Sequence, residues 1–146
     1  MSASRLVIVP VGALDGRVTA ALEVARRTPA GRHVALHVAG DGGGARDLGL
    51  AWMAAEHPEP LVILDGTEAD TDDADVAAGV AAYVRNELAR GVSDVVVVAG
   101  HLLPATSWHR LRHDGTAARI AARLDGDPRV ITVLVPVPAH HARSTP

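Results

Sequence analysis

The sequence predicts an α/β protein with a three-layer, doubly wound sheet of five parallel strands. Five short apolar runs, nearly continuous and rich in β-branched residues, are typical of strands that are buried on both faces. Segments with helical periodicity alternate with these runs along the 146 residues. A repeated β-α-β order with short connections implies right-handed crossovers, and therefore a parallel sheet with helices on both faces.

Residue patterns place each element. The predicted strands are Leu6–Val11, Val34–Val38, Leu61–Leu64, Val95–Ala99 and Val130–Val135. The predicted helices have apolar residues at helical spacing, and they are Asp15–Arg27, Arg46–Glu56, Asp75–Arg90 and Thr116–Leu124. We expect Asp15 to cap the first helix and Thr28-Pro29 to end it. Gly91 is expected to end the third helix.

Length and composition exclude several classes of protein. We expect one domain at residues 1–138 and a polar tail at 139–146. The chain has no Cys, which excludes disulfides and thiolate sites, and all 14 of its basic residues are Arg, which excludes lysine chemistry. The apolar runs are much shorter than the roughly 20 residues of a membrane helix, and no signal peptide pattern precedes the first strand. We therefore expect a cytoplasmic protein that does not insert into the membrane.

Residue types also disfavour nucleic-acid binding and catalysis. The chain carries a formal charge of −3 and has few aromatic residues with which to stack bases, namely Trp52, Tyr83 and Trp108. Ser107 lies close to histidines, but no G-x-S-x-G elbow surrounds it. His109 and His113 have the spacing of two zinc ligands on a helix, but the glutamate of a zinc protease is absent between them. We predict no catalytic residue and no metal site.

Two connections permit more than one interpretation. The connection Asp65–Asp75 contains six acidic residues and no Arg. We interpret it as a solvated loop whose charge favours the start of the next helix, with a divalent-cation loop as the alternative, although EF-hand spacing is absent. The segment Gly40–Ala45 spells G-x-G-x-x-A but follows the second predicted strand, whereas a dinucleotide fingerprint usually follows the first. We interpret it as a flexible turn.

Ligands of doubly wound sheets bind at the carboxyl ends of the strands, where the strand order reverses. With the first strand at the centre, that crevice is lined by Val11–Leu14, Val38–Gly42 and Ala99–Thr116. The last segment combines a glycine after a strand, several His and Arg residues, and the start of a helix. Backbone N–H groups at a helix start attract phosphate, and Arg adds bidentate contacts. The pattern predicts a nucleotide-phosphate site; the alternative is that Asp114 or Thr116 only caps the helix.

Three segments resemble a known family: VIVPVGALDG at Val7–Gly16, ALHVAGD at Ala35–Asp41 and SWHRLRHDGTAARI at Ser107–Ile120. Over about residues 5–138 the chain resembles a universal stress protein domain. It is most similar to the diverged version found as the cytosolic C-terminal domain of bacterial APC-type amino-acid and potassium permeases. The resemblance implies the strand order 3-2-1-4-5. It also implies an adenine nucleotide as ligand, either ATP or AMP, with or without Mg²⁺, or cyclic di-AMP at a dimer interface.

The sequence departs from the ATP-binding pattern of that family at two positions. Gly12 stands where ATP-binding members have an Asp, and Leu103 stands where they have the second Gly of a G-x-x-G pattern, whereas Gly115-Thr116 matches the final pair. The resemblance implies these nucleotide-binding candidates: Val11, Gly12, Ala13, Val38, Ala39, Gly40, Gly100, His101, Arg110, Arg112, His113, Gly115 and Thr116.

The expected function is a non-enzymatic regulatory module that binds an adenine nucleotide and regulates a membrane transporter. The alternative is a diverged dimerisation or docking module without a nucleotide. In this superfamily dimers often form through the last strand, so the resemblance implies a homodimer through Arg129–Val137. The apolar sequence of this edge gives the dimer a physical motive. Pro136 and Pro138 are expected to limit strand pairing at its end.

Overall fold

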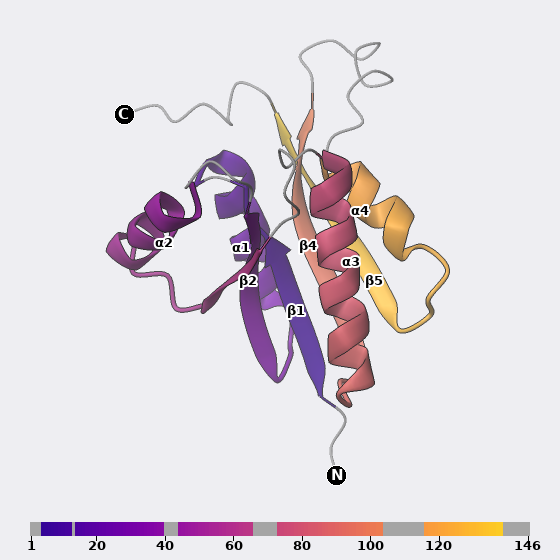
Figure 1. Cartoon of the computed structure of the whole chain (residues 1–146). Helices are drawn as coiled ribbons and strands as arrows, with labels where there is room; N and C mark the ends of the chain where they lie inside the picture. The colour runs from indigo at the N-terminus through magenta and orange to yellow at the C-terminus, as the bar shows by residue number, and fades with distance from the viewer. Residues whose placement is uncertain (1–3, 13, 40–43, 66–72, 104–115, 139–146) are drawn as a thin grey trace.

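The computed structural model describes residues 4–12, 14–39, 44–65, 73–103 and 116–138. A five-stranded parallel sheet in the order β3-β2-β1-β4-β5 forms the centre of the molecule, with four helices around it (Figure 1). The predicted fold class is confirmed, and so is the strand order typical of universal stress proteins. Among the described residues, no helix is both long enough and apolar enough to cross a membrane.

The elements alternate along the chain as predicted. The strands are β1 Arg5–Pro10, β2 Arg32–Ala39, β3 Leu61–Asp65, β4 Asp94–Leu103 and β5 Val130–Pro138. The helices are α1 Gly16–Arg27, α2 Gly44–Ala54, α3 Asp73–Ala89 and α4 Thr116–Leu124. The polar tail that we expected at 139–146 lies outside the described residues.

Apolar side chains of the sheet point alternately into two cores, one on each face. On one face, Leu6 and Ile8 of β1 pack with α3 and α4, where Val80, Val84 and Ile120 are buried. On the other face, Val7 and Val9 pack with α1 and α2, where Leu22 and Trp52 are buried. Because both faces of β1 are covered, its sequence is a continuous apolar run.

Capping explains where two helices begin and end. The carboxylate of Asp15 accepts hydrogen bonds from the backbone N–H groups of Arg17 and Val18, as the sequence predicted. Thr28 closes the last turn through a hydrogen bond from its N–H to the carbonyl oxygen of Ala25. Gly91 follows α3 with a φ angle of +113°, which glycine adopts without strain. The predicted ends of α1 and α3 are thus confirmed to within one residue.

Several predicted boundaries differ from the structure. Helix α2 begins and ends two residues earlier than expected. Glu56, where we expected the helix to end, lies in the left-handed region with a φ angle of +57°. Strands β4 and β5 are longer than expected and stay paired up to Leu103 and Pro138. We expected Gly100 and His101 to follow the fourth strand; they lie within it.

Pro136 and Pro138 lie within β5 and do not interrupt its pairing with β4. The reason is geometric. The N–H of Val95 in β4 bonds to the carbonyl oxygen of Arg129 at 2.9 Å, so the backbone of Arg129 faces β4. Backbone groups of successive residues alternate between the two sides of a strand, and therefore the nitrogens of Pro136 and Pro138 face the open edge of the sheet. The prolines therefore leave the pairing with β4 intact and remove N–H donors at the open edge, where we expected them to limit pairing.

Candidate functional site

A hollow lies above the carboxyl end of β1, because β1 ends at Pro10 while its neighbour β4 continues to Leu103. This is the point where the strand order reverses, between β1 and β4. The hollow has a volume of about 130 Å³ and walls from α1, α3, α4 and β4. Its lining residues are Pro10, Val11, Gly12, Asp15, Arg17, Val18, Val76, Ala99, Gly100, Ala117 and Ile120.

Asp15 and Arg17 form the polar wall of this hollow. The Nε and Nη2 atoms of Arg17 donate to Oδ2 of Asp15 at 3.1 and 2.7 Å. The other carboxylate oxygen accepts from the N–H of Arg17 at 2.9 Å and of Val18 at 3.4 Å. A carboxylate already neutralises the positive end of the α1 dipole, so an anionic ligand would meet less attraction there than at an open helix start.

Gly100 allows α1 to pack closely on β4. A Cβ atom at this position would lie 2.4 Å from the carbonyl oxygen of Arg17 and 2.7 Å from its Cβ. Such distances are far inside van der Waals contact, so any side chain would push the first turn of α1 away from the sheet. Packing between two elements therefore requires a glycine at this position, which the resemblance gave as a nucleotide-binding candidate.

The end of β1 is held by a histidine of the neighbouring strand. Nδ1 of His37 lies 2.7 Å from the carbonyl oxygen of Val11 and donates to it, and the N–H of Val11 donates to the carbonyl oxygen of Leu36. Gly12 follows in an exposed position, with open space where a Cβ would be. The backbone at Gly12 is thus accessible at a fixed edge of the hollow.

The structure brings together only some of the predicted ligand residues. Val11, Gly12 and Gly100 line the hollow, beside the first turn of α4 that begins at Thr116. Val38 and Ala39 are buried at the end of β2, and the described residues that line the hollow do not include them. His101 is half-buried in β4 and pairs with Pro136. Six candidates lie outside the described residues: Ala13, Gly40, Arg110, Arg112, His113 and Gly115.

Sequence reasoning missed two polar residues of this site. Asp15 was predicted only as a helix cap, and Arg17 was not singled out. Their positions three and five residues after Gly12, at the start of the helix that follows a central strand, were the signal that could have found them. Residues in that first turn face the same crevice as the strand end.

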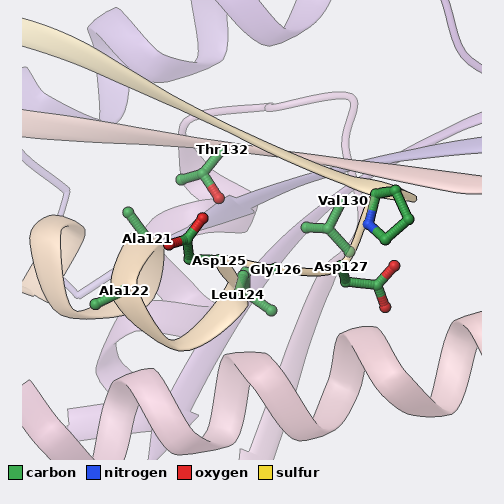
Figure 2. Close-up of a pocket in the computed structure, with 9 residues that line it drawn as sticks. Ala121, Ala122, Leu124, Asp125, Gly126, Asp127, Val130 and Thr132 are labelled. Atoms are coloured by element: carbon green, nitrogen blue, oxygen red, sulfur yellow. The ribbon is translucent and has the colours of Figure 1, made fainter.

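Small-molecule sites usually enclose roughly 300–1,000 Å³, and the hollow formed by described residues is smaller than this range. A nucleotide bound there would extend beyond the described residues. A larger hollow of about 610 Å³ lies at the edge of the molecule, between the end of α4 and β5. Figure 2 shows it with Asp125 and Thr132 pointing toward one another. It is far from the switch point, and we do not assign the ligand to it.

Metal binding finds no support in the described part of the chain, where no three His, Asp or Glu side chains are grouped as ligands. The interpretations of His109, His113 and the acidic connection fall largely on residues outside that part.

One comparison with known proteins identifies a family. The family model described as the KimA potassium transporter C-terminal domain matches residues 3–137. The match covers nearly the whole chain, from before β1 to the penultimate residue of β5. No curated protein matches the sequence.

Proposed function

The chain belongs to the family of KimA potassium transporter C-terminal domains, and from this membership we propose that it is a non-enzymatic regulatory domain of a potassium transporter. Its signal is an adenine nucleotide, cyclic di-AMP or ATP/AMP, bound at the hollow above β1. The observation that carries the proposal is the family match over residues 3–137. It agrees with the expected transporter partner and with a role in regulation.

The position of the hollow supports the nucleotide as ligand. It combines an exposed backbone at Gly12 with the N-terminal turn of α4. Backbone N–H groups at a helix start favour phosphate, and α4 has no acidic residue in its first turn. The predicted Arg110 and Arg112 immediately precede this helix in the sequence and would add bidentate contacts to the phosphates.

A dimerisation or docking module is the second candidate. β5 is an edge strand with two exposed apolar side chains, Ile131 at 52% and Leu134 at 37%. The open edge lacks N–H donors at Pro136 and Pro138, and the N–H of Val130 already bonds to the carbonyl oxygen of Asp127. A homodimer through 129–137 would therefore rely on side-chain contacts rather than on a continuous sheet.

Thermal-shift screening against ATP, ADP, AMP, cyclic AMP, cyclic di-AMP and cyclic di-GMP, with and without Mg²⁺, tests the proposal. A ligand at 100 times its dissociation constant stabilises a protein by about 2.7 kcal/mol, which for this length is a shift of several degrees. A shift limited to adenine nucleotides supports the nucleotide-sensing domain. Unchanged melting temperatures across the panel favour the docking module.

A matched pair of variants tests the site. Arg110→Ala with Arg112→Ala should weaken nucleotide binding and leave the melting temperature of the free protein nearly unchanged. The control is Arg27→Ala with Arg90→Ala, which removes the same charge from exposed positions at the other end of the sheet. Equal nucleotide affinity in both variants would remove Arg110 and Arg112 from the site.

A further inference from the structure

Exposed arginines gather at the amino end of the strands, opposite the hollow. In a parallel α/β sheet, the C-termini of the helices and the first residues of the strands lie at this end. Six exposed arginines, which we call the arginine face, lie at this end: Arg26, Arg27, Arg32, Arg90, Arg123 and Arg129. The exposed carboxylates in the same turns are Glu56 and Asp125, and Asp127 beside Arg129 is 31% exposed. Exposed arginines therefore outnumber exposed carboxylates in these turns, although the chain as a whole carries −3.

Two of these arginines form ion pairs in which the carboxylate is buried and the guanidinium is exposed. Arg26 donates to both carboxylate oxygens of Glu59 at 2.6 and 2.9 Å, with the side chains 41% and 4% exposed. Arg32 donates to Glu87 at 2.6 Å, with exposures of 56% and 6%. In both pairs the carboxylate lies inside and the guanidinium outside. A partner that approaches this end meets the remaining N–H donors of the arginines before it meets the carboxylates.

Helix dipoles explain only part of this arrangement. Arg26 and Arg27 lie in the last turn of α1, where a cation stabilises the helix, and Arg90 follows α3 directly. Arg32 begins β2 and Arg129 immediately precedes β5, where the cation neutralises no helix end of its own. The concentration of exposed arginine at one end thus exceeds what the local stability of the helices requires.

The first described residues of the chain lie at the same end of the sheet. The N–H and Oγ of Ser93 both bond to the carbonyl oxygen of Ser4 at 2.8 Å, next to the start of β1. Figure 1 shows the start of β1 beside the end of α3, with the carboxyl ends of β4 and β5 at the opposite side of the molecule. The start of β1 and the arginine face therefore lie at the same end of the molecule.

We propose that the arginine face lies against the anionic surface of the membrane in which the transporter sits. The proposal rests on the proposed function, which supplies the membrane part. Phospholipid phosphates and anionic headgroups are bidentate acceptors that suit guanidinium groups. The orientation leaves the hollow above β1 on the far side of the sheet, where it is open to soluble nucleotides.

Ionic screening makes this attraction local. Electrostatic interactions are screened over about 10 Å at 0.1 M salt, whereas the ten residues of β4 span roughly 33 Å. The membrane therefore senses the near end of the domain and not the net charge of −3. Each arginine close to an anionic surface is worth on the order of 1 kcal/mol, equivalent to about a fivefold change in partitioning.

Co-sedimentation of the full chain with vesicles, without nucleotide, tests the proposal. At 0.1 M salt the protein should bind vesicles of phosphatidylcholine with one-third phosphatidylglycerol, and should not bind pure phosphatidylcholine. Arg27→Gln with Arg90→Gln should weaken binding roughly thirty-fold. The matched control, Arg46→Gln with Arg119→Gln, removes the same charge from exposed positions in α2 and α4 outside the arginine face and should bind like the parent chain. Circular dichroism checks that both variants are folded.

Each other outcome overturns the proposal in a specific way. No binding to anionic vesicles, or an equal loss in both variant pairs, removes the arginine face as a membrane contact. Stronger competition by inorganic phosphate than by chloride at equal ionic strength would point to a discrete phosphate site instead of a surface. Because the nucleotide screen contains no vesicles, failure of either experiment leaves the other interpretable.

Discussion

The two ends of the sheet are built on opposite principles. At the carboxyl end, β4 and β5 continue past β1, α1 packs closely on Gly100, and a small hollow remains. At the amino end, the turns are closed by ion pairs whose carboxylates are buried and whose arginines are exposed. Close packing therefore dominates at one end and charge at the other. We accordingly propose a ligand at the carboxyl end and a membrane contact at the amino end.

The same three-residue pattern appears at both ends and shows what context adds. In Asp15-Gly16-Arg17 and in Asp127-Pro128-Arg129, the Asp accepts a hydrogen bond from the backbone N–H two residues later, at 2.9 Å in both, and pairs with the guanidinium. Asp15 begins a helix and lines the hollow, whereas Asp127 lies in an exposed turn before β5. Substitutions at these and neighbouring positions should separate the effects of packing, burial and exposure.

Gly100→Ala should have the largest effect on stability. The new Cβ would meet the Arg17 carbonyl oxygen at 2.4 Å, and a backbone atom of a packed helix cannot move away without cost. Overpacking of this kind costs about 1–3 kcal/mol or more, seen as a lower denaturation midpoint in urea. The control is Gly49→Ala in α2, where nothing lies within 4 Å of the new Cβ; it should stabilise by about 0.5–1 kcal/mol. Equal stability of Gly100→Ala and the parent chain would contradict the close approach.

Arg26→Gln should have the next largest effect, at the amino end. It leaves the buried carboxylate of Glu59 without the guanidinium that donates to both of its oxygens. Because Arg26 is 41% exposed, we expect a loss of roughly 1–2 kcal/mol, less than for a fully buried pair. Chemical denaturation at pH 7 measures it.

The pH dependence of this variant distinguishes its cause. Burial raises the pKa of Glu59, but hydrogen bonds from Arg26 and from its own backbone N–H outweigh burial, so the pKa lies below its usual value of 4.5. The pair therefore stabilises the protein above pH 4.5, and this stability is lost as pH falls through the lowered pKa. In Arg26→Gln burial prevails, so the variant should become more like the parent chain in stability below pH 4.5. A constant difference from pH 3 to pH 7 would argue against the ion pair.

The fold was predictable from the sequence because it depends on patterns that act locally. An apolar run such as that of β1 predicts a strand at its own position, and a stop signal such as Gly91 predicts a helix end at its own position. Together such local patterns predicted all five strands and all four helices. The site was less predictable, because Gly100 reports on a contact with α1 that is remote in the sequence. A glycine after an apolar run has the same sequence pattern whether a helix or a ligand approaches it.

The ends of β4 and β5 show the same limit. Pro136 and Pro138 are unfavourable in a strand unless their nitrogens face an open edge, and the sequence does not state which side of β5 is open. In the structure β5 pairs with β4 from Val95 to Leu103, so the other side of β5 is the open edge. Buried Glu59 is a further case, since its partner Arg26 is 33 residues away in the sequence.

Asp15→Ala should have a moderate effect at the carboxyl end. It removes a helix cap that accepts from two backbone N–H groups, which costs about 1 kcal/mol, or roughly 2–4 °C in melting temperature for a chain of this length. Asp15→Asn keeps the acceptor and removes the charge, so it should recover most of this stability. If the two variants are equally destabilised, the charge pair with Arg17 matters more than the cap.

Arg129→Gln should have the smallest effect on stability, although its geometry resembles that of Arg17. Both Asp127 and Arg129 are exposed to solvent, where water and salt screen the pair, and the melting temperature should stay within about 1 °C of the parent. The titration of Asp127 should change instead. Its pKa lies below its usual value, first because the Arg129 side chain bonds to the carboxylate and second because the Arg129 backbone N–H does. Carboxyl NMR should show this pKa rising in Arg129→Gln, by less than the full shift because the backbone bond remains. An unchanged pKa of Asp127 would mean that the Arg129 guanidinium is not held at the carboxylate in solution and is free to bind an outside anion.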